Sequence, residues 1–459
     1  MRRDDFLKIT VKKILEVCHG KLLSGDTNLE IEKYSIDTRT IKNGDIYVAI
    51  KGDNVDGNNF INQAFEKGAL GCITEQNVSC ELLKKYENKI IIMVKNSITA
   101  LQQIASFVRD KYNIPVIAIT GSVGKTSTKD IISNVVAQKY NVLKTEGNLN
   151  NHIGLPLTLL NLDNHEAIVV EMGMNHFGEI SALSKIAKPT ISVITNIGTS
   201  HIGNLGSREN ILKAKLEILD GMSKNGSLVI NNDNDLLHDW WQKKPWKNTY
   251  TFGINNKSNY MAENVVEHDY YSTFNIEGNA ININVSGKSF IYNALAAYSV
   301  GKLLNISSDK IVKGIEDFTL TEKRMEIRKT SNNSVVIEDY YNASLESTIM
   351  ALDVLSNLKA SKKIAVLGDI LELGNFSEKI HKEIGSKIPE YDVDVLITVG
   401  KDAENIAKEA QKSGFQNIHV CAKNTEAIHY LMREITDNSA ILIKASHGMN
   451  FGEIAKGVK

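Results

Sequence analysis

Cysteine and proline are both scarce in this chain of 459 residues. Five prolines are too few to mark domain boundaries with proline-rich linkers, so we locate the boundaries from the pattern of strands and helices. The scattered cysteines form no Cys-x-x-Cys motif, which argues against a disulfide framework or a cysteine metal cluster. Such usage is typical of proteins in the reducing cytoplasm, where we expect this one. The four cysteines are Cys18, Cys72, Cys80 and Cys421.

The chain also lacks an excess of one charge and a long apolar run. Lys and Arg number 53 and Asp and Glu 54, so the net charge is −1. This balance argues against a nucleic-acid-coating surface or a polybasic membrane anchor, but it leaves room for a local basic pocket. The apolar run Ile90 to Val94 is far too short to span a bilayer, and Met1-Arg-Arg-Asp-Asp begins no signal sequence. We therefore expect no nucleic-acid partner and no membrane insertion.

The length and the pattern of apolar runs favour an α/β fold with three domains, at about 100–200 residues per domain. Residues 1–95 mix short helices with apolar strands and contain no catalytic constellation, which favours a binding role for a small mixed α/β N-terminal domain. In residues 96–321, continuous apolar strands alternate with helical stretches, as in a parallel sheet covered on both faces. Residues 322–459 alternate even more regularly and predict a doubly wound, Rossmann-like C-terminal domain.

A glycine-rich turn in the central domain has the context of a phosphate loop. It reads Thr120-Gly-Ser-Val-Gly-Lys-Thr126 and lies between a predicted strand, Val116 to Thr120, and a predicted helix. The backbone N–H groups of such a turn bind phosphate, Lys125 would reach the β- and γ-phosphates, and the Thr126 hydroxyl would bind Mg²⁺. Ile119 stands where the usual pattern has its first glycine. The context favours phosphate binding over an unliganded glycine turn, but it does not identify the reaction.

Further polar residues follow the strands of the same predicted sheet. Glu171 ends the apolar strand Ala167 to Glu171, where a Mg²⁺ ligand of a P-loop protein belongs, although a solvated strand-end glutamate fits this residue alone equally well. His201 follows the strand Ile191 to Asn196, and its place beside Glu171 and the loop favours a functional role. By itself Lys215 is typical of a solvated helix lysine. Three amides by themselves indicate only a turn-rich loop: Asn148, Asn150 and Asn151.

Taken together and in this order, the strings resemble the motifs of the Mur ligase family. They are Thr120–Thr126, Gly147–Pro156, Glu171–Met174, Asn196 with His201, and Lys213–Glu217. Other strings resemble the branch of that family that joins D-alanyl-D-alanine to UDP-N-acetylmuramoyl-tripeptide. They are Asp37–Arg39, Gly44–Gly52, Asp56-Gly57, Tyr341–Ala343 and Gly368–Gly374. The resemblance covers essentially the whole chain.

The resemblance implies a role for each domain and for individual residues. The first domain would hold the UDP part of the substrate, the second would be a P-loop ATPase core, and the third would carry D-alanyl-D-alanine and part of the nucleotide site. The catalytic residues would be Lys125, His201 and Lys215, and Lys215 would be carbamylated. ATP would contact Gly121, Ser122, Val123, Gly124, Lys125, Thr126, Asn293, Arg324, Asp339 and Asn342. Two Mg²⁺ ions would be held by Thr126, Glu171, His201 and Lys215, and the substrate by Asp37, Arg39, Asn148, Asn150 and Asn151.

The chain departs from the family pattern at the edges of the implied site. The family usually has His-Asn at Ser289-Phe290, Asn-Pro at Ser344-Leu345, and Gly-Ser-Arg-Gly at Ala445-Ser446-His447-Gly448. The metal and phosphate residues are intact. These departures therefore affect the adenine and dipeptide ends of the site and leave the phosphate end unchanged.

The implied reaction is an ATP-dependent amide ligation through an acyl phosphate in peptidoglycan precursor synthesis, EC 6.3.2.10. Its partners would be small molecules, and because family members are usually monomeric, we expect a monomer. The third residue of the tripeptide, lysine or diaminopimelate, stays open. Two alternatives also stay open: another ligase of this architecture, such as a folylpolyglutamate synthetase or a different Mur branch, and a nucleotide-binding regulatory homologue without catalysis.

Overall fold

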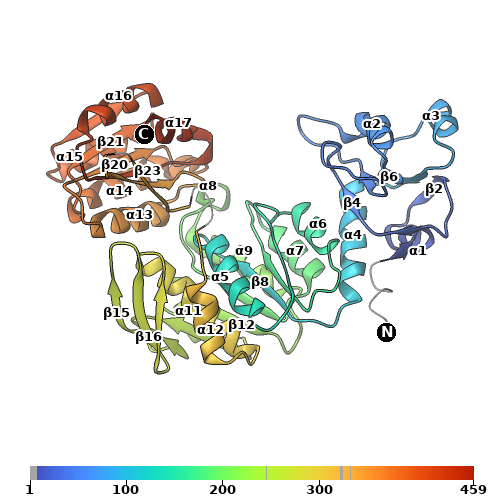
Figure 1. The fold of residues 1–459 in the computed structure, drawn as a ribbon, viewed down its shortest axis with the longest axis horizontal. Coiled ribbons are helices and arrows are strands. Elements are labelled where there is room, and N and C mark those ends of the chain that lie inside the picture. The colour runs from blue at the N-terminus through green and yellow to red at the C-terminus, as the bar shows by residue number, and fades with distance from the viewer. Residues whose placement is uncertain (1–7, 244–245, 321–323, 331, 459) are drawn as a thin grey trace.

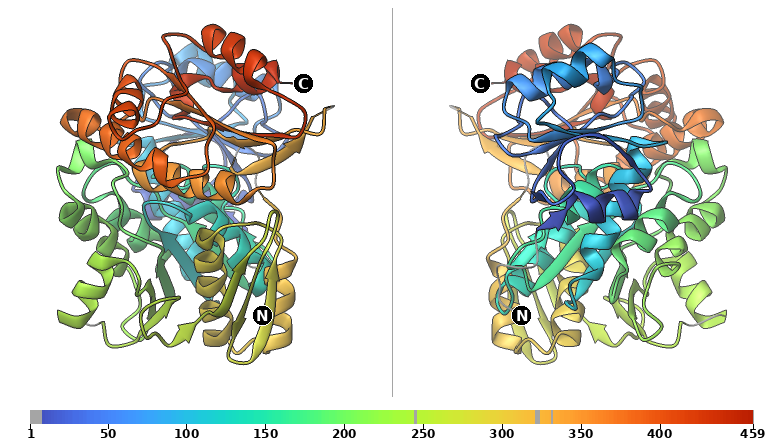
Figure 2. Two further views of the ribbon diagram at one scale, coloured as in Figure 1. Left: turned by 90° about the vertical axis from the view of Figure 1, so that its left-hand side faces the viewer. Right: turned by 90° about the vertical axis from the view of Figure 1, so that its right-hand side faces the viewer.

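The computed structural model describes residues 8–243, 246–320, 324–330 and 332–458. Its helices and strands form three parts in chain order, coloured blue, light blue through green to yellow, and orange to red in Figure 1. The N-terminal and C-terminal parts lie at opposite ends of the long axis, and each rests on the central part (Figures 1 and 2). The predicted α/β class is confirmed, since most strands pair in parallel. No helix of the described residues is long and apolar enough to cross a membrane.

The N-terminal part is built on a five-stranded sheet of order β2-β7-β6-β5-β4, in which only β2 is antiparallel to its neighbour. The Thr10 hydroxyl caps the first helix, which buries Val11, Ile14 and Cys18 on one face. Strands β1 and β3 form a separate antiparallel pair. The strands are β1 (Ile9–Thr10), β2 (Lys21–Ser24), β3 (Glu30–Ile31), β4 (Tyr34–Ser35), β5 (Ile46–Val48), β6 (Gly71–Thr74) and β7 (Ile90–Met93), and the helices are α1 (Val11–Cys18), α2 (Ile61–Glu66) and α3 (Cys80–Lys85).

The central part contains a seven-stranded parallel sheet of order β14-β13-β12-β11-β8-β10-β9. Every residue of β8 and β10 is buried, as expected for apolar strands covered on both faces. The sheet strands are β8 (Val116–Thr120), β9 (Val142–Lys144), β10 (Ala167–Glu171), β11 (Ile191–Ile194), β12 (Ser227–Asn231), β13 (Thr249–Gly253) and β14 (Tyr260–Met261). The helices are α4 (Ser97–Asp110), α5 (Lys125–Ala137), α6 (Gly154–Leu159), α7 (Glu179–Ala187), α8 (Ile202–Leu205), α9 (Arg208–Leu216), α10 (Asp235–Lys243), α11 (Lys288–Leu303) and α12 (Ser308–Glu316).

The register of this sheet brings the predicted strand-end residues to one edge. Glu171 of β10 lies opposite Ile119 of β8, and Ile194 of β11 lies opposite Thr120. The phosphate loop, Glu171 and the segment after β11 therefore leave the sheet side by side. The carboxyl ends of parallel strands are where ligands bind in such sheets.

A three-stranded antiparallel sheet, which the sequence analysis did not predict, completes the central part. Strands β15 (Glu263–Glu267), β16 (Ser272–Ile276) and β17 (Asn279–Ile283) pair in chain order. Figure 1 shows them beneath α13 (Leu345–Asn357) of the C-terminal part.

The C-terminal part is a six-stranded sheet of order β18-β19-β23-β20-β21-β22, parallel except for β18. Helices on both faces make it doubly wound, as predicted (Figure 1). Its strands are β18 (Glu326–Lys329), β19 (Val335–Asp339), β20 (Lys362–Gly368), β21 (Val395–Val399), β22 (Ile418–Cys421) and β23 (Ser439–Lys444). Besides α13, its helices are α14 (Ser377–Lys387), α15 (Glu404–Lys412), α16 (Asn424–Glu434) and α17 (Gly452–Gly457).

The domain boundaries after residues 95 and 321 stay proposals. The first falls between β7 and α4, and α4 packs against both α1 and the central helices α6 and α7. Residues 321–323, where the second boundary was predicted, lie outside the described residues.

Candidate active site

The phosphate loop adopts a conformation that requires its glycines. Gly124 has φ +81°, a left-handed conformation, and precedes α5, which begins at Lys125. A Cβ on Gly121 would lie 1.9 Å from Oγ1 of Thr195. Ile119 is fully buried within β8, so the position of the missing glycine belongs to the strand and the turn begins after it. The unusual isoleucine is therefore compatible with an intact loop.

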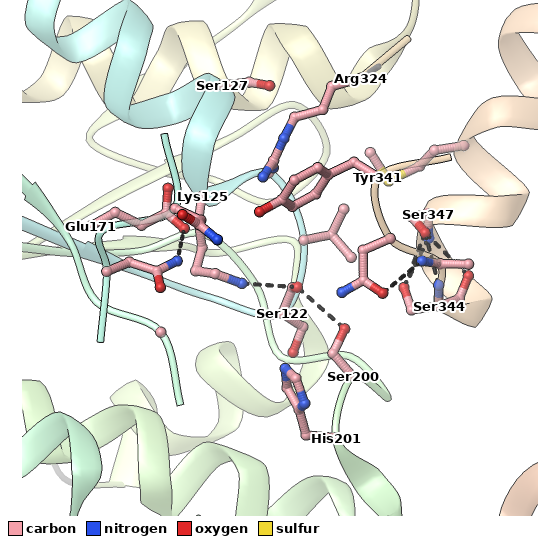
Figure 3. Close-up of a pocket in the computed structure, with 18 of the residues that line it drawn as sticks. Ser122, Lys125, Ser127, Glu171, Ser200, His201, Arg324, Tyr341, Ser344 and Ser347 are labelled. Carbon is pink, nitrogen blue, oxygen red and sulfur yellow. Dashed lines mark hydrogen bonds between the residues drawn. The ribbon is translucent and has the colours of Figure 1, made fainter. Parts of the chain in front are cut away.

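A cavity of about 510 Å³ lies over this loop, between the central and C-terminal parts (Figure 3). Most of the residues predicted for ATP, metal and substrate line it, although they are spread from the P-loop to the C-terminal sheet. They are Ser122, Val123, Gly124, Lys125, Asn148, Asn150, Asn151, Glu171, His201, Lys215, Asn293, Arg324, Asp339 and Asn342.

The other predicted residues lie elsewhere. Gly121 and Thr126 do not line the cavity, although the buried Thr126 hydroxyl donates to Oε2 of the lining residue Glu171 over 2.7 Å. Asp37 and Arg39 lie in the N-terminal part, away from this cavity, and form an ion pair of 2.7 Å in which the Arg39 side chain is 86% exposed. An exposed pair of this kind contributes little to stability.

Two lysines that line the cavity converge on one carbonyl oxygen of the phosphate loop. The Nζ atoms of Lys125 and Lys215 each donate to the carbonyl oxygen of Gly121 over 2.9 Å. Burial, and then the positive charge of Lys125, lower the pKa of Lys215 well below its ordinary value. Burial also lowers the pKa of Lys125, and Glu171 opposes this. Lys215 is 2% exposed whereas Lys213 is exposed, so only Lys215 faces the site.

The residues proposed as metal ligands provide only a few side-chain atoms that could coordinate a metal ion. Among the described residues, no group of three or more His, Cys, Asp or Glu side chains could hold a metal ion. Mg²⁺ is usually bound by one or two carboxylates together with substrate phosphates and waters. The Thr126 hydroxyl and the buried Glu171 carboxylate, which also accepts from Nδ2 of Asn150 over 2.7 Å, fit that donor set.

His201 contacts the C-terminal part. It lies just before α8 with φ +62°, and its Nδ1 is 2.7 Å from Oε2 of Glu372. Burial and the charge of Lys125 lower the pKa of His201, although Glu372 opposes them. The lowered pKa favours the neutral imidazole, the form in which a ring nitrogen can bind a metal.

The C-terminal wall contains residues that the sequence analysis did not select. Nζ of Lys444 donates to Oδ2 of Asp339 over 2.6 Å, with both side chains largely buried. The Arg324 guanidinium lies 4.1 Å from the centroid of the Tyr341 ring. Lys444 directly follows the apolar run Ala440 to Ile443, which was a usable signal. Nothing local in the sequence indicates that Glu372 would reach His201.

A second cavity of about 270 Å³ lies on the other side of the phosphate loop. Its walls include Phe252, Tyr292 and Asn293, and Oδ1 of Asn293 accepts from the Thr128 hydroxyl over 2.9 Å. Most of the departures from the family pattern lie around the two cavities. Ser289 lines both, Phe290 and Ser344 line the first, and the exposed His447 contacts the Tyr341 ring edge-on.

Comparisons with known proteins agree with this architecture. Three stretches match family models: residues 30–109 match "Mur ligase family, catalytic domain", residues 119–301 match "Mur ligase middle domain", and residues 323–447 match "Mur ligase, glutamate ligase domain". A UDP-N-acetylmuramoyl-tripeptide–D-alanyl-D-alanine ligase of Bacillus subtilis is 37% identical over 457 residues, with 98% of both chains covered. The chain belongs to the Mur ligase family. The predicted resemblance is thereby confirmed.

Solved structures place this Mur ligase near the MurF proteins. Crystal structure I of MurF from Acinetobacter baumannii has a TM-score of 0.90 at 27% identity and covers 98% of both chains. MurF of Thermotoga maritima in complex with ADP has a TM-score of 0.81 at 26% identity, covering 93% of this chain and 96% of that one. The three-part fold of this Mur ligase is thus that of the MurF structures.

Proposed function

We propose that this Mur ligase joins D-alanyl-D-alanine to UDP-N-acetylmuramoyl-tripeptide and converts ATP to ADP and phosphate, the reaction EC 6.3.2.10. The observation that carries the proposal is the pair of buried lysines, Lys125 and Lys215, meeting at a phosphate loop in a cavity shared with the C-terminal part. The full-length similarity to ligases of this name supports it. The product is a precursor of peptidoglycan.

The groups in the cavity suit an acyl-phosphate route. A carboxylate and an amine do not condense in water without activation, so a carboxylate oxygen of the tripeptide attacks the γ-phosphorus and ADP leaves. The dipeptide amine then attacks the acyl carbon, and phosphate departs with the bridging oxygen. Several negative charges meet in this step, and Lys125 is placed to stabilise them. The C-terminal part forms one wall of the cavity, and its closure over bound substrates would exclude the water that hydrolyses an acyl phosphate.

Two Mg²⁺ ions are part of the proposal. Thr126 and Glu171 would hold one, and His201 and a carbamylated Lys215 the other. When bound, the ions neutralise phosphate charge. Because an ordinary lysine has a pKa of about 10.4, it is almost fully protonated near pH 7 and does not capture CO₂. The lowered pKa of Lys215 makes its neutral amine available, and addition of CO₂ gives a carbamate anion and releases one proton.

The substrates would be divided among the three parts. Asp37 and Arg39 of the N-terminal part would hold the uridine diphosphate, and Asn148, Asn150 and Asn151 the sugar and peptide that reach the cavity. Asn293, Arg324, Asp339 and Asn342 would hold the nucleotide. Since ATP and UDP-sugars are cytoplasmic metabolites, the reaction would take place in the cytoplasm, and the site is complete in one chain, which is compatible with a monomer.

A substrate panel tests this proposal. Phosphate release is measured with ATP, several UDP-linked muramoyl peptides that end in lysine or diaminopimelate, and several amines. We expect turnover with a tripeptide and D-alanyl-D-alanine together, and little with either alone. Turnover only with single amino acids or with folates would indicate a ligase of another branch. Nucleotide binding without turnover on any pair would indicate a regulatory homologue.

A further inference from the structure

Residues 196–203, which follow β11 and include the first two residues of α8, connect the phosphate loop to the C-terminal part. On one side it is hydrogen-bonded to the loop: the backbone N–H of Ser122 donates to the Asn196 carbonyl over 3.0 Å, and that of Val123 to its Oδ1 over 2.9 Å. The N–H of Gly198 donates to Oγ of Ser122 over 2.8 Å. These contacts hold the segment in register with the phosphate loop.

On its other side the same segment contacts the C-terminal part. The Thr199 hydroxyl donates to Oε2 of Glu346 over 3.0 Å, and Nδ1 of His201 lies 2.7 Å from Oε2 of Glu372. A Cβ on Gly203 would lie 2.4 Å from the carbonyl oxygen of Glu372, so only glycine permits this approach. Figure 1 shows α8 where the central and C-terminal parts meet.

Both partners of the closest contact have unusual backbone conformations. His201 has φ +62° and Glu372 has φ +64°, and neither is glycine. A left-handed conformation at a non-glycine residue is strained and persists where the surroundings require it. The two residues are 171 positions apart in the chain and belong to different parts of the molecule. The contact between their side chains therefore forms only when the C-terminal part docks on the central part.

The contact determines which ring nitrogen of His201 is free. An ionised carboxylate only accepts hydrogen bonds, so Nδ1 carries the hydrogen and donates it to Glu372. Nε2 then keeps its lone pair, and Figure 3 shows the His201 ring pointing toward Ser122 in the pocket. Outer partners of this kind fix the tautomer and orientation of a metal-binding histidine.

We propose that Glu372 is a positioning residue that completes the metal site from the C-terminal part: it orients His201 only when that part is docked on residues 196–203. The inference rests on the proposed function for the identity of the Mg²⁺–ATP ligand. Glu372 of the C-terminal part would thus control the orientation of His201, although the phosphate loop belongs to the central part. The metal site would therefore be completed together with the walls that exclude water.

Spectroscopy of bound Mn²⁺ tests the inference without any turnover. Mn²⁺ and a non-hydrolysable ATP analogue are added to the whole protein, and electron spin-echo modulation reports a nitrogen ligand on the metal. We expect nitrogen coupling in the unchanged protein and none in His201→Ala. Glu372→Ala should lose most of the coupling and weaken Mn²⁺ binding about 10- to 100-fold, whereas Glu372→Gln, which can still accept from Nδ1, should keep part of both.

Two substitutions in α8 distinguish a loss of docking from a general loss of structure. Gly203→Ala blocks docking by its methyl group and should reproduce the loss seen in Glu372→Ala, whereas Asn204→Ala, an exposed neighbour in α8, should change nothing. The Glu372 side chain is 57% exposed, so its replacement should leave the melting temperature nearly unchanged. Full nitrogen coupling and unchanged Mn²⁺ affinity in folded Glu372→Ala would overturn the inference, as would absence of coupling in the unchanged protein. Because the probe needs neither tripeptide nor dipeptide, these outcomes are independent of the substrate panel.

Discussion

At the scale of the single residue, Lys215 is the feature of this active site that a simple P-loop ATPase would not need. Its side chain is buried next to a second lysine, and its nearest acceptor among the described hydrogen bonds is the Gly121 carbonyl. A lysine kept only for structure would be expected to have a carboxylate partner. The environment instead favours a neutral amine, the form that reacts with CO₂.

We therefore expect Lys215→Ala to lower phosphate release by about 10²- to 10³-fold, the range seen when a group that stabilises transition-state charge is removed. Short carboxylic acids should restore part of the activity, because they can supply the missing carboxylate. Lys213→Ala is the matched control, since that residue is exposed two positions away. Full activity in Lys215→Ala, or loss of activity in Lys213→Ala, would contradict the assignment.

At the scale of the element, the best-buried strands of the central sheet could be predicted closely, whereas the partly exposed strands β9, β13 and β14 were not predicted. The apolar runs Val116 to Thr120, Ala167 to Glu171 and Ser227 to Asn231 coincide with β8, β10 and β12, whereas the predicted strand Ile191 to Asn196 extends two residues beyond the end of β11. Strands buried on both faces are apolar throughout, so the run itself shows where they begin and end. The phosphate loop follows from the same pattern, because its glycines lie directly after such a strand.

The antiparallel sheet β15–β17 was not predicted, for a related reason. Its strands are partly exposed and alternate polar with apolar residues, so they form no continuous apolar run. A usable signal was present: Glu277-Gly278 forms a two-residue turn in which both residues have positive φ, between Ile276 and its partner Asn279. A glycine-containing turn between alternating strands is typical of a hairpin.

The loop of Asp37 and Arg39 yields a prediction at this scale. If it holds the diphosphate, Arg39→Ala removes a charge-assisted contact of about 1.5–3 kcal/mol, so the Kd for the UDP-tripeptide should rise about 10- to 100-fold. The affinity for ATP should not change, because ATP would bind in another part of the molecule. Isothermal titration of each ligand measures both. Lys85→Ala, on α3 of the same part, is the control. Loss of ATP affinity to the same degree would contradict the assignment.

At the scale of the whole molecule, the contacts that shape the site join distant positions. Asp339 and Lys444 are 105 residues apart, and His201 and Glu372 are 171 apart. Sequence patterns place such residues at strand ends, but they do not show how one sheet docks on another. That is why Glu171 and His201 could be selected from the sequence whereas Glu372 could not.

The arrangement also predicts closure on ligand binding. The N-terminal and C-terminal parts lie at opposite ends of the central part, and an acyl phosphate has to be shielded from water (Figure 1). Small-angle scattering should show a smaller radius of gyration when a non-hydrolysable ATP analogue and the UDP-tripeptide are both bound than with either alone. An unchanged radius with both ligands would indicate a site that is closed beforehand.

The central claim is that the tripeptide carboxylate is activated by phosphoryl transfer from ATP. The most direct measurement uses UDP-N-acetylmuramoyl-tripeptide with ¹⁸O in the reacting carboxylate, ATP and D-alanyl-D-alanine, followed by mass analysis of the released phosphate. Because the bridging oxygen of the acyl phosphate leaves with phosphorus, we predict one ¹⁸O atom in each phosphate released from fully labelled substrate. Amide product formed together with unlabelled phosphate would contradict the account.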